Sequence, residues 1–167
     1  MNILAIDPGP VQSAIVLLSP DRKILEASIE GNEKVASLLR TGGTFYGWPH
    51  VAIEMIASYG MPVGAEVFET CTWIGRFEEA YVHTDLKARY FRKDIKLHLC
   101  GSNRARDSNV RQALIDLLGP AGIKKNPGPT YGIKRDMWAA LAVAVYAHHV
   151  LNQPNPVATY VHLALNK

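Results

Sequence analysis

The chain has 167 residues, of which 48% are hydrophobic and 20% charged, and its formal net charge is +3. This is the composition of one ordinary soluble globular domain with enough apolar residues for a core of its own. The longest apolar stretch, residues 137–151, is shorter than a membrane span, and the chain has no internal repeat or low-complexity segment.

Two further features of the sequence predict a cytosolic protein. The chain enters an apolar strand at its first residues, without a basic segment or a small-residue cleavage site. Cys71 and Cys100 stand apart and form no CxxC or Cys/His cluster. Isolated cysteines of this kind are typical of a reducing compartment and of a chain without a zinc site.

The charges are distributed unevenly along the chain. Residues 1–83 contain five Lys or Arg and ten Asp or Glu, whereas residues 84–135 contain twelve Lys or Arg and four Asp or Glu. A basic half suits a polyanionic partner, because phosphates attract clustered cations. A solvated basic face without a ligand explains the same pattern, and charge alone leaves both explanations open.

The first quarter of the chain predicts an antiparallel meander. Apolar runs predict strands at 2–7 and 13–18, and alternating apolar and polar residues predict a third strand at 23–29. Short turns rich in Pro and Gly separate the first two strands. Helical spacing follows at 32–40, with Asn32 as the expected N-cap.

The rest of the chain predicts an α/β layout. A buried strand at 51–56 precedes a long amphipathic helix at 65–83, and a further strand is expected at 94–99. The last two helices are expected at 107–119 and, in an Ala-rich segment, at 135–151. The loop between them is long and rich in Gly and Pro, which is often a sign of function.

Acidic residues occur inside two apolar strands, where a carboxylate is costly unless it is paired. Asp7 ends the first strand and Glu54 lies in the fourth, so their carboxylates can meet if these strands are parallel neighbours. Asp136 opens the last helix, whose N-terminus can reach the same point. Converging carboxylates repel one another unless a divalent cation neutralises them. Their hard oxygen ligands suit Mg²⁺ or Mn²⁺, as in the metal sites that hydrolyse phosphodiesters.

Two of the three acids also have a purely structural explanation. Asp7 can cap its own Asp-Pro-Gly turn, and Asp136 can interact with the helix dipole. Glu54 inside an apolar strand is harder to explain in this way. The three residues taken together favour a functional site.

Four segments of the chain, taken in order, resemble those of a known family. They are ILAIDPGPVQSAIVLL, VAIEMI, GSNRARDSNVRQALIDLLG and RDMWAALAVAVYA. They are similar, in that order, to the first hairpin, the second acidic strand, the glycine-rich loop with its helix, and the closing helix of the RuvC-type Holliday junction resolvases, in the ribonuclease H-like superfamily. The resemblance spans roughly residues 2–149, and several segments resemble a divergent, phage-borne branch.

The resemblance implies an α/β fold with a ribonuclease H-like mixed five-stranded sheet flanked by helices, over residues 1–152, and a C-terminal tail at 153–167. It implies a homodimeric, Mg²⁺-dependent endonuclease, with Mn²⁺ as a substitute, that cuts four-way DNA junctions in the bacterial cytoplasm. Asp7, Glu54 and Asp136 would be its catalytic metal ligands.

The chain departs from the family pattern at three places. The closing helix of the family has a second acidic or ligand residue three positions after the first, where this chain has Ala139. Asp107 stands where the family has a catalytic lysine, and it is either a replacement ligand or the N-cap of its helix. The family's aromatic residue after the second acid corresponds to Ala57. Tyr59 and Met61 are the nearest substitutes for stacking on an unpaired base, unless Tyr59 is a surface residue without a role.

Basic residues flank the two glycine-rich segments and are candidate phosphate contacts if those loops border the acids. They are Arg104, Arg106, Arg111, Lys124, Lys125, Lys134 and Arg135. A second group of basic residues follows the long helix, and its side chains are expected either to be solvated or to contact DNA at the edge of the binding site. This group consists of Lys87, Arg89, Arg92 and Lys93.

Three alternatives to a junction resolvase remain open. The first is a nuclease of the same fold that cuts flaps, forks or RNA–DNA hybrids. The second is a junction-binding protein that keeps the fold but has impaired catalysis. The third is an actin-like or sugar-kinase ATPase, which is disfavoured because the chain is too short for two such domains.

Overall fold

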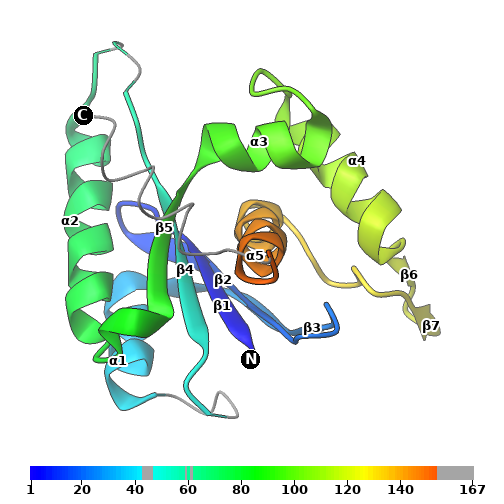
Figure 1. Cartoon of the computed structure of the whole chain (residues 1–167), viewed down its shortest axis with the longest axis horizontal. Helices are drawn as coiled ribbons and strands as arrows, with labels where there is room; N and C mark the ends of the chain where they lie inside the picture. Colours follow the sequence, from blue (N-terminus) through cyan, green and yellow to red (C-terminus); the bar gives the residue numbers. More distant parts are fainter. Residues whose placement is uncertain (43–46, 59, 61, 154–167) are drawn as a thin grey trace.

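A mixed five-stranded sheet lies at the centre of the fold, with strand order β3-β2-β1-β4-β5 (Figure 1). Its strands are β1 (Ile3–Asp7), β2 (Gln12–Leu18), β3 (Ile24–Gly31), β4 (His50–Met55) and β5 (Lys87–Phe91). The first three form an antiparallel meander, whereas β4 runs parallel to β1 and β5 runs parallel to β4. The computed structural model describes residues 1–42, 47–58, 60 and 62–153. It confirms the predicted fold class.

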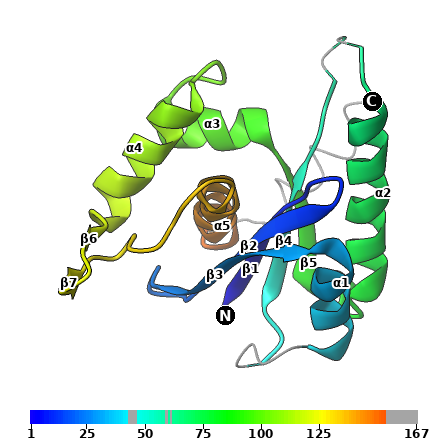
Figure 2. The same cartoon turned by 180° about the vertical axis from the view of Figure 1, so that it is seen from behind.

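Helices cover both faces of this sheet (Figures 1 and 2). They are α1 (Asn32–Thr41), α2 (Ala65–Ala80), α3 (Arg92–Cys100), α4 (Asp107–Leu118) and α5 (Met137–Leu151), with a 3-10 turn, η1 (Thr84–Leu86), before β5. A small hairpin, β6 (Gly122–Ile123) and β7 (Asn126–Pro127), follows α4. α1 and α2 lie on one face and α5 crosses the other, with α3 and α4 beyond it. Within the described ranges, no helix is both long and apolar enough to cross a bilayer.

Each face of the sheet has its own hydrophobic core, because side chains alternate along every strand. Ile6 and Ile53 point to the α1 and α2 side and pack with Phe77, which is fully buried. The opposite face presents small side chains to α5, at Ala5, Ala14, Ala52 and Ala88. These small residues allow the Ala-rich α5 to lie close to the strands, so the start of α5 is positioned beside the ends of β1 and β4.

The strand predicted at residues 94–99 is wrong, and the fifth strand of the sheet lies earlier in the chain. Residues 94–99 belong to α3, and the edge strand is β5. The segment DIKLHL alternates apolar and polar residues, which is typical of a strand, yet Ile95 and Leu99 share one helical face that packs on the core. Leu97 points away from that face and is 55% exposed. The long helix also ends earlier than predicted, at Ala80.

The two predicted helix caps are each displaced by one residue. Asn32 is the first residue of α1, whose N-cap is Gly31. Asp107 is the first residue of α4, and Arg106 is its N-cap, with the Arg106 backbone N–H donating to Asn109 Oδ1 at 3.0 Å. Both side chains are therefore available for contacts outside their own helix. The predicted C-terminal tail lies outside the described residues from 154 onward.

Candidate functional site

Asp7 and Glu54 lie at the carboxyl ends of two neighbouring parallel strands. Ile6 of β1 is in register with Ile53 of β4, so the next residues along, Asp7 and Glu54, are neighbours. Both occupy positions on the α5 side of the sheet, because Ala52, two residues before Glu54, belongs to that core. The structure thus brings together the two carboxylates that the sequence singled out.

The Asp7 carboxyl lies where a negative charge is unfavourable. Burial is the largest cause and the Glu54 carboxylate the next, and with Asp136 and Asp107 they raise the pKa of Asp7 to about 8, against the opposing effect of Arg92. Among the described residues, no group donates a hydrogen bond to this carboxylate. Asp7 therefore does not cap its own turn, and its two oxygens are available as ligands.

The turn behind Asp7 is held by residues from other elements. Ser13 Oγ donates to Asn32 Oδ1 at 2.7 Å, and Asn32 Nδ2 donates to the Gly9 carbonyl at 2.9 Å. A Cβ atom at Gly9 would lie 2.5 Å from the carbonyl oxygen of Gln12, which no side chain can tolerate. Asn32 is 2% exposed. This buried network fixes the chain directly after Asp7.

Arg92, the first residue of α3, bridges two of the acids. Its Nη1 donates to Glu54 Oε1 and Oε2, each at 3.0 Å, and its Nη2 donates to Asp107 Oδ1 at 2.8 Å. Burial raises the pKa of Glu54, and Arg92 acts against this rise. Burial lowers the pKa of Arg92, but Glu54 and Asp107 raise it by more, so the guanidinium stays charged. The site therefore contains a cation of its own.

Asp107 pairs with cations from α3. The hydrogen bond from Arg92 is the main cause that lowers the pKa of Asp107. Lys96 Nζ lies 3.4 Å from the same Oδ1 atom. The Asp107 side chain is 74% exposed, so it is positioned at the rim of the site, where it orients Arg92.

Asp136 reaches the site from the N-terminus of α5, of which it is the N-cap. Its backbone carbonyl accepts hydrogen bonds from the N–H groups of Ala139 and Ala140. Its carboxylate is near enough to raise the pKa of Asp7. Ala139, one turn later, brings no ligand atom to the site.

The donor set suits a hard divalent cation, because it consists of carboxylate oxygens whose mutual repulsion a cation relieves. In the part of the chain that the structure describes, no three His, Cys, Asp or Glu side chains are placed so that they could hold a metal ion. Both oxygens of Glu54 are hydrogen-bonded to Arg92. The chemistry of the donors therefore suits a divalent cation, but metal binding would require Arg92 to leave Glu54 and the acidic side chains to come closer together.

Several of the predicted DNA-binding residues lie around this site. Arg104 and Arg106 are exposed in the α3–α4 turn beside Asp107, and Lys134 and Arg135 are exposed directly before Asp136. Arg111 lies on α4, with its guanidinium carbon 4.9 Å from the centre of the Trp138 ring. Tyr59, the candidate for base stacking, and Met61 lie outside the described residues.

Lys124 and Lys125 lie elsewhere. They follow β6 in the small hairpin beyond the C-terminal end of α4, whereas Asp107 begins that helix (Figure 1). A helix of 12 residues is about 18 Å long. The hairpin that carries these two lysines therefore lies away from the acids, although the same loop ends at Asp136. Any contact that the two lysines make would be with a more distant part of a bound polyanion.

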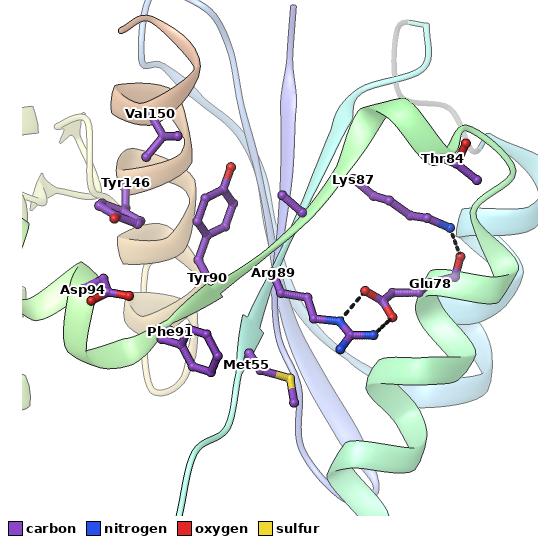
Figure 3. Close-up of a pocket in the computed structure, with 11 residues that line it drawn as sticks. Met55, Glu78, Thr84, Lys87, Arg89, Tyr90, Phe91, Asp94, Tyr146 and Val150 are labelled. Carbon is purple, nitrogen blue, oxygen red and sulfur yellow. Dashed lines mark hydrogen bonds and ion pairs between the residues drawn. The ribbon is translucent and has the colours of Figure 1, made fainter. Parts of the chain in front are cut away.

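A separate hollow of about 410 Å³ flanks the edge strand β5 (Figure 3). Tyr90 and Tyr146 line its α5 side, and Arg89 forms an ion pair with Glu78 of α2 on the other side. The sequence did not reveal this hollow, because β5 was not predicted.

Sequence reasoning also missed the role of Arg92 and Lys96. Arg92 was expected on a solvated or DNA-grazing face, yet its side chain contacts residues 38 and 15 positions away in the chain. The available signal was the alternation of Ala88 and Tyr90 with charged residues, which predicts a strand that points Arg92 to the same side as Tyr90.

Comparisons with solved structures give the same fold. A structure of Thermus thermophilus RuvC has a TM-score of 0.63 and 18% identity, and the match covers 90% of this chain and 96% of that one. A structure of T. thermophilus RuvC in complex with Holliday junction substrate has a TM-score of 0.61 and 19% identity, with coverage of 89% and 96%. No family model and no curated protein matches the sequence. The chain therefore has the fold of RuvC.

Proposed function

We propose that this chain is a divalent-metal-dependent, structure-selective DNA endonuclease that resolves four-way junctions by phosphodiester hydrolysis. The observation that carries the proposal is the placement of Asp7 beside Glu54 and near Asp136, where burial and these carboxylates raise its pKa to about 8. A cluster in which carboxylates suppress one another's charge favours a bound cation. The likeness to a RuvC structure that contains a Holliday junction substrate supports the substrate class.

Asp7, Glu54 and Asp136 are the residues that would hold Mg²⁺, or Mn²⁺ in its place. A bound ion of this kind supplies charge stabilisation at the scissile phosphate and lowers the pKa of water. Asp7 and Glu54 lie on paired strands, so the backbone holds the two residues side by side. Asp136 is exposed at the start of α5, so bound DNA could reach it.

The basic residues around the site would position the DNA. Arg104 and Arg106 are exposed just before Asp107 in the chain, and Lys134 and Arg135 are exposed just before Asp136. Contacts from such side chains to phosphates fix the register of a bound duplex without reading its sequence. This arrangement suits an enzyme that recognises the shape of a branch.

The active form would be a homodimer, because a four-way junction needs two symmetrically placed cuts. α2 offers an exposed aromatic side chain for such an interface: Ile74 and Phe77 are buried under the helix, but Phe68 is 63% exposed. Large exposed aromatic residues are enriched at protein interfaces.

Two features favour a second candidate, a branched-DNA-binding protein with weak or lost catalysis. Arg92 occupies both oxygens of Glu54, and Ala139 brings no second acid from α5. The loss of that acid also makes a less selective nuclease of flaps, forks or RNA–DNA hybrids a reasonable variant of the proposal.

The test is the cleavage of a labelled synthetic four-way junction beside matched duplex, flap, fork and RNA–DNA hybrid, with Mg²⁺, Mn²⁺ or EDTA. Paired symmetric nicks in the junction that vanish with EDTA and with Asp7→Asn support a resolvase. Equal cutting of flaps, forks or hybrids identifies a broader nuclease. Tight binding without cutting in either metal identifies the binding protein, and cleavage by Asp7→Asn contradicts the assignment of the site.

A further inference from the structure

Arg92 and a divalent cation would need the same two atoms of this protein. The Arg92 Nη1 atom lies 3.0 Å from both Glu54 oxygens, so one nitrogen is shared between the whole carboxylate. A metal ion at Glu54 binds through these same oxygens. The Arg92 guanidinium and a metal ion bound to the same carboxylate would be close enough to repel each other. This repulsion is strong at a buried position, and Glu54 is only 8% exposed.

Of the two partners, Arg92 is the one that can move. Glu54 lies inside β4, which pairs with β1 on one side and β5 on the other. The Arg92 side chain is 36% exposed, and Arg92 is the first residue of α3. Its second nitrogen is bonded to Asp107, whose side chain is 74% exposed.

Asp107 gives Arg92 a second place to bind. If Nη1 leaves Glu54, the guanidinium keeps its bond to Asp107 and needs no new buried partner. Lys96 Nζ also lies 3.4 Å from Asp107 Oδ1. The Asp107 carboxylate therefore has a cationic partner whether or not Arg92 is bonded to Glu54. The ion pair can thus open at Glu54 without leaving the guanidinium unpaired, and the incoming cation would neutralise the buried Glu54 carboxylate, so the costly event of an unpaired buried charge is avoided.

We propose that Arg92 is a built-in competitor of the divalent cation: it neutralises Glu54 while no metal is bound, and it withdraws toward Asp107 when a metal occupies Glu54. The inference rests on the proposed function, because it takes Glu54 as a metal ligand. It makes Arg92 a positioning residue that weakens the binding of metal to the free protein. Removal of the Arg92 charge should therefore strengthen metal binding.

The test is a titration of the DNA-free protein with Mg²⁺ at pH 8.5, followed by calorimetry and by the rise in unfolding temperature. The protein is compared with Arg92→Gln, Arg92→Lys and Arg89→Gln. Arg89 is a matched control, because it lies on the neighbouring strand and pairs with Glu78, away from the acids. Circular dichroism in EDTA establishes that each variant is folded.

Arg92→Gln is expected to bind Mg²⁺ more tightly than the unsubstituted protein by about tenfold, the scale of effect of one close competing charge. Arg92→Lys keeps the charge and is expected to stay near the original affinity, as is Arg89→Gln. Equal or weaker binding by Arg92→Gln overturns the inference, since Arg92 would then only hold Glu54 in place.

The outcomes also separate this inference from the proposed function. If the unsubstituted protein cleaves the junction but Arg92→Gln gains no Mg²⁺ affinity, the proposal that Arg92 competes with the metal fails and the proposed nuclease function stands. If no variant binds Mg²⁺, with or without junction DNA, the metal site itself is wrong, and both proposals fail together.

Discussion

The side-chain amide of Asn32 donates a hydrogen bond to the carbonyl of Gly9 at 2.9 Å, and so ties the start of α1 to the turn that follows Asp7. The same side chain accepts a hydrogen bond from Ser13 at the start of β2. One buried residue therefore connects three elements behind the first acid of the site. The polar atoms of Asn32 hold the turn that follows Asp7 and do not cap α1.

Replacement of Asn32 should therefore affect both stability and activity. Asn32→Ala leaves the Gly9 carbonyl without its donor and the Ser13 hydroxyl without its acceptor, and we expect a loss of about 1–3 kcal/mol in the free energy of unfolding. Urea denaturation measures this loss, with the exposed Ser37→Ala in the same helix as the control. Junction cleavage should fall as well. An unfolding free energy equal to that of the control would show that the network does not stabilise the turn.

Asp7 should make the stability depend on pH. The native carboxyl keeps its proton up to a pH of about 8, whereas the unfolded chain releases it near the ordinary value of 3.8. Between these values the native state binds more protons, so the free energy of unfolding in EDTA should fall as pH rises. The slope from this one group is at most about 1.4 kcal/mol per pH unit.

Asp7→Asn provides the comparison, since it removes the titration without a large change in shape. The advantage of the variant over the unsubstituted protein should grow from about pH 4 to about pH 8 and then level off. Urea denaturation at several pH values in EDTA measures it. Addition of Mg²⁺ at pH 8 should stabilise the unsubstituted protein and not Asp7→Asn. Parallel pH profiles for the two proteins would contradict the raised pKa.

Two glycines should respond to alanine in opposite directions. Gly9→Ala places a Cβ atom 2.5 Å from the Gln12 carbonyl oxygen, whereas a Cβ atom at Gly75, inside α2, would meet nothing within 4 Å beyond the backbone of its own helix. We expect Gly9→Ala to destabilise the protein, and Gly75→Ala to stabilise it by about 0.5–1 kcal/mol through helix propensity. Thermal unfolding measures both. A harmless Gly9→Ala would show that the turn can rearrange.

The hairpin lysines should contribute to DNA binding and not to chemistry. The double substitution Lys124→Ala and Lys125→Ala should weaken junction binding, and lower the slope of log affinity against log salt by up to about 2. The cleavage rate at saturating DNA should stay unchanged, because these residues lie beyond the far end of α4 from Asp107. Binding titrations at several salt concentrations measure the slope. An unchanged slope would mean that the hairpin does not touch phosphate.

The exposed ring of Phe68 should control the oligomeric state. Phe68→Ser removes a side chain that is 63% exposed, so the fold should keep its stability while the proposed dimer dissociates. Sedimentation measures the mass, and Phe77→Ser, at a fully buried position, should instead unfold the protein. A Phe68→Ser protein that stays dimeric would place the interface elsewhere.

Much of the fold can be predicted from the sequence, because the spacing of apolar residues over a long segment is compatible with only one type of secondary structure. The meander, the buried strand with Glu54, the helix at α2 and the Ala-rich α5 are all long enough for their apolar spacing to be decisive. The positions of Asp7 and Glu54 also follow, since an isolated carboxylate in an apolar strand has few explanations. Their meeting required only that β1 and β4 be parallel neighbours.

Tertiary structure alone decided the rest. The edge strand β5 and the helix α3 share the same alternation of apolar and polar residues, so spacing alone does not show where the strand ends and the helix begins. Arg92 meets Glu54 and Asp107 only because β5 ends beside β4 and α3 turns back toward α4. Ion pairs between residues so far apart in the chain leave no mark on local spacing, because it is the register of the sheet that brings their charges together.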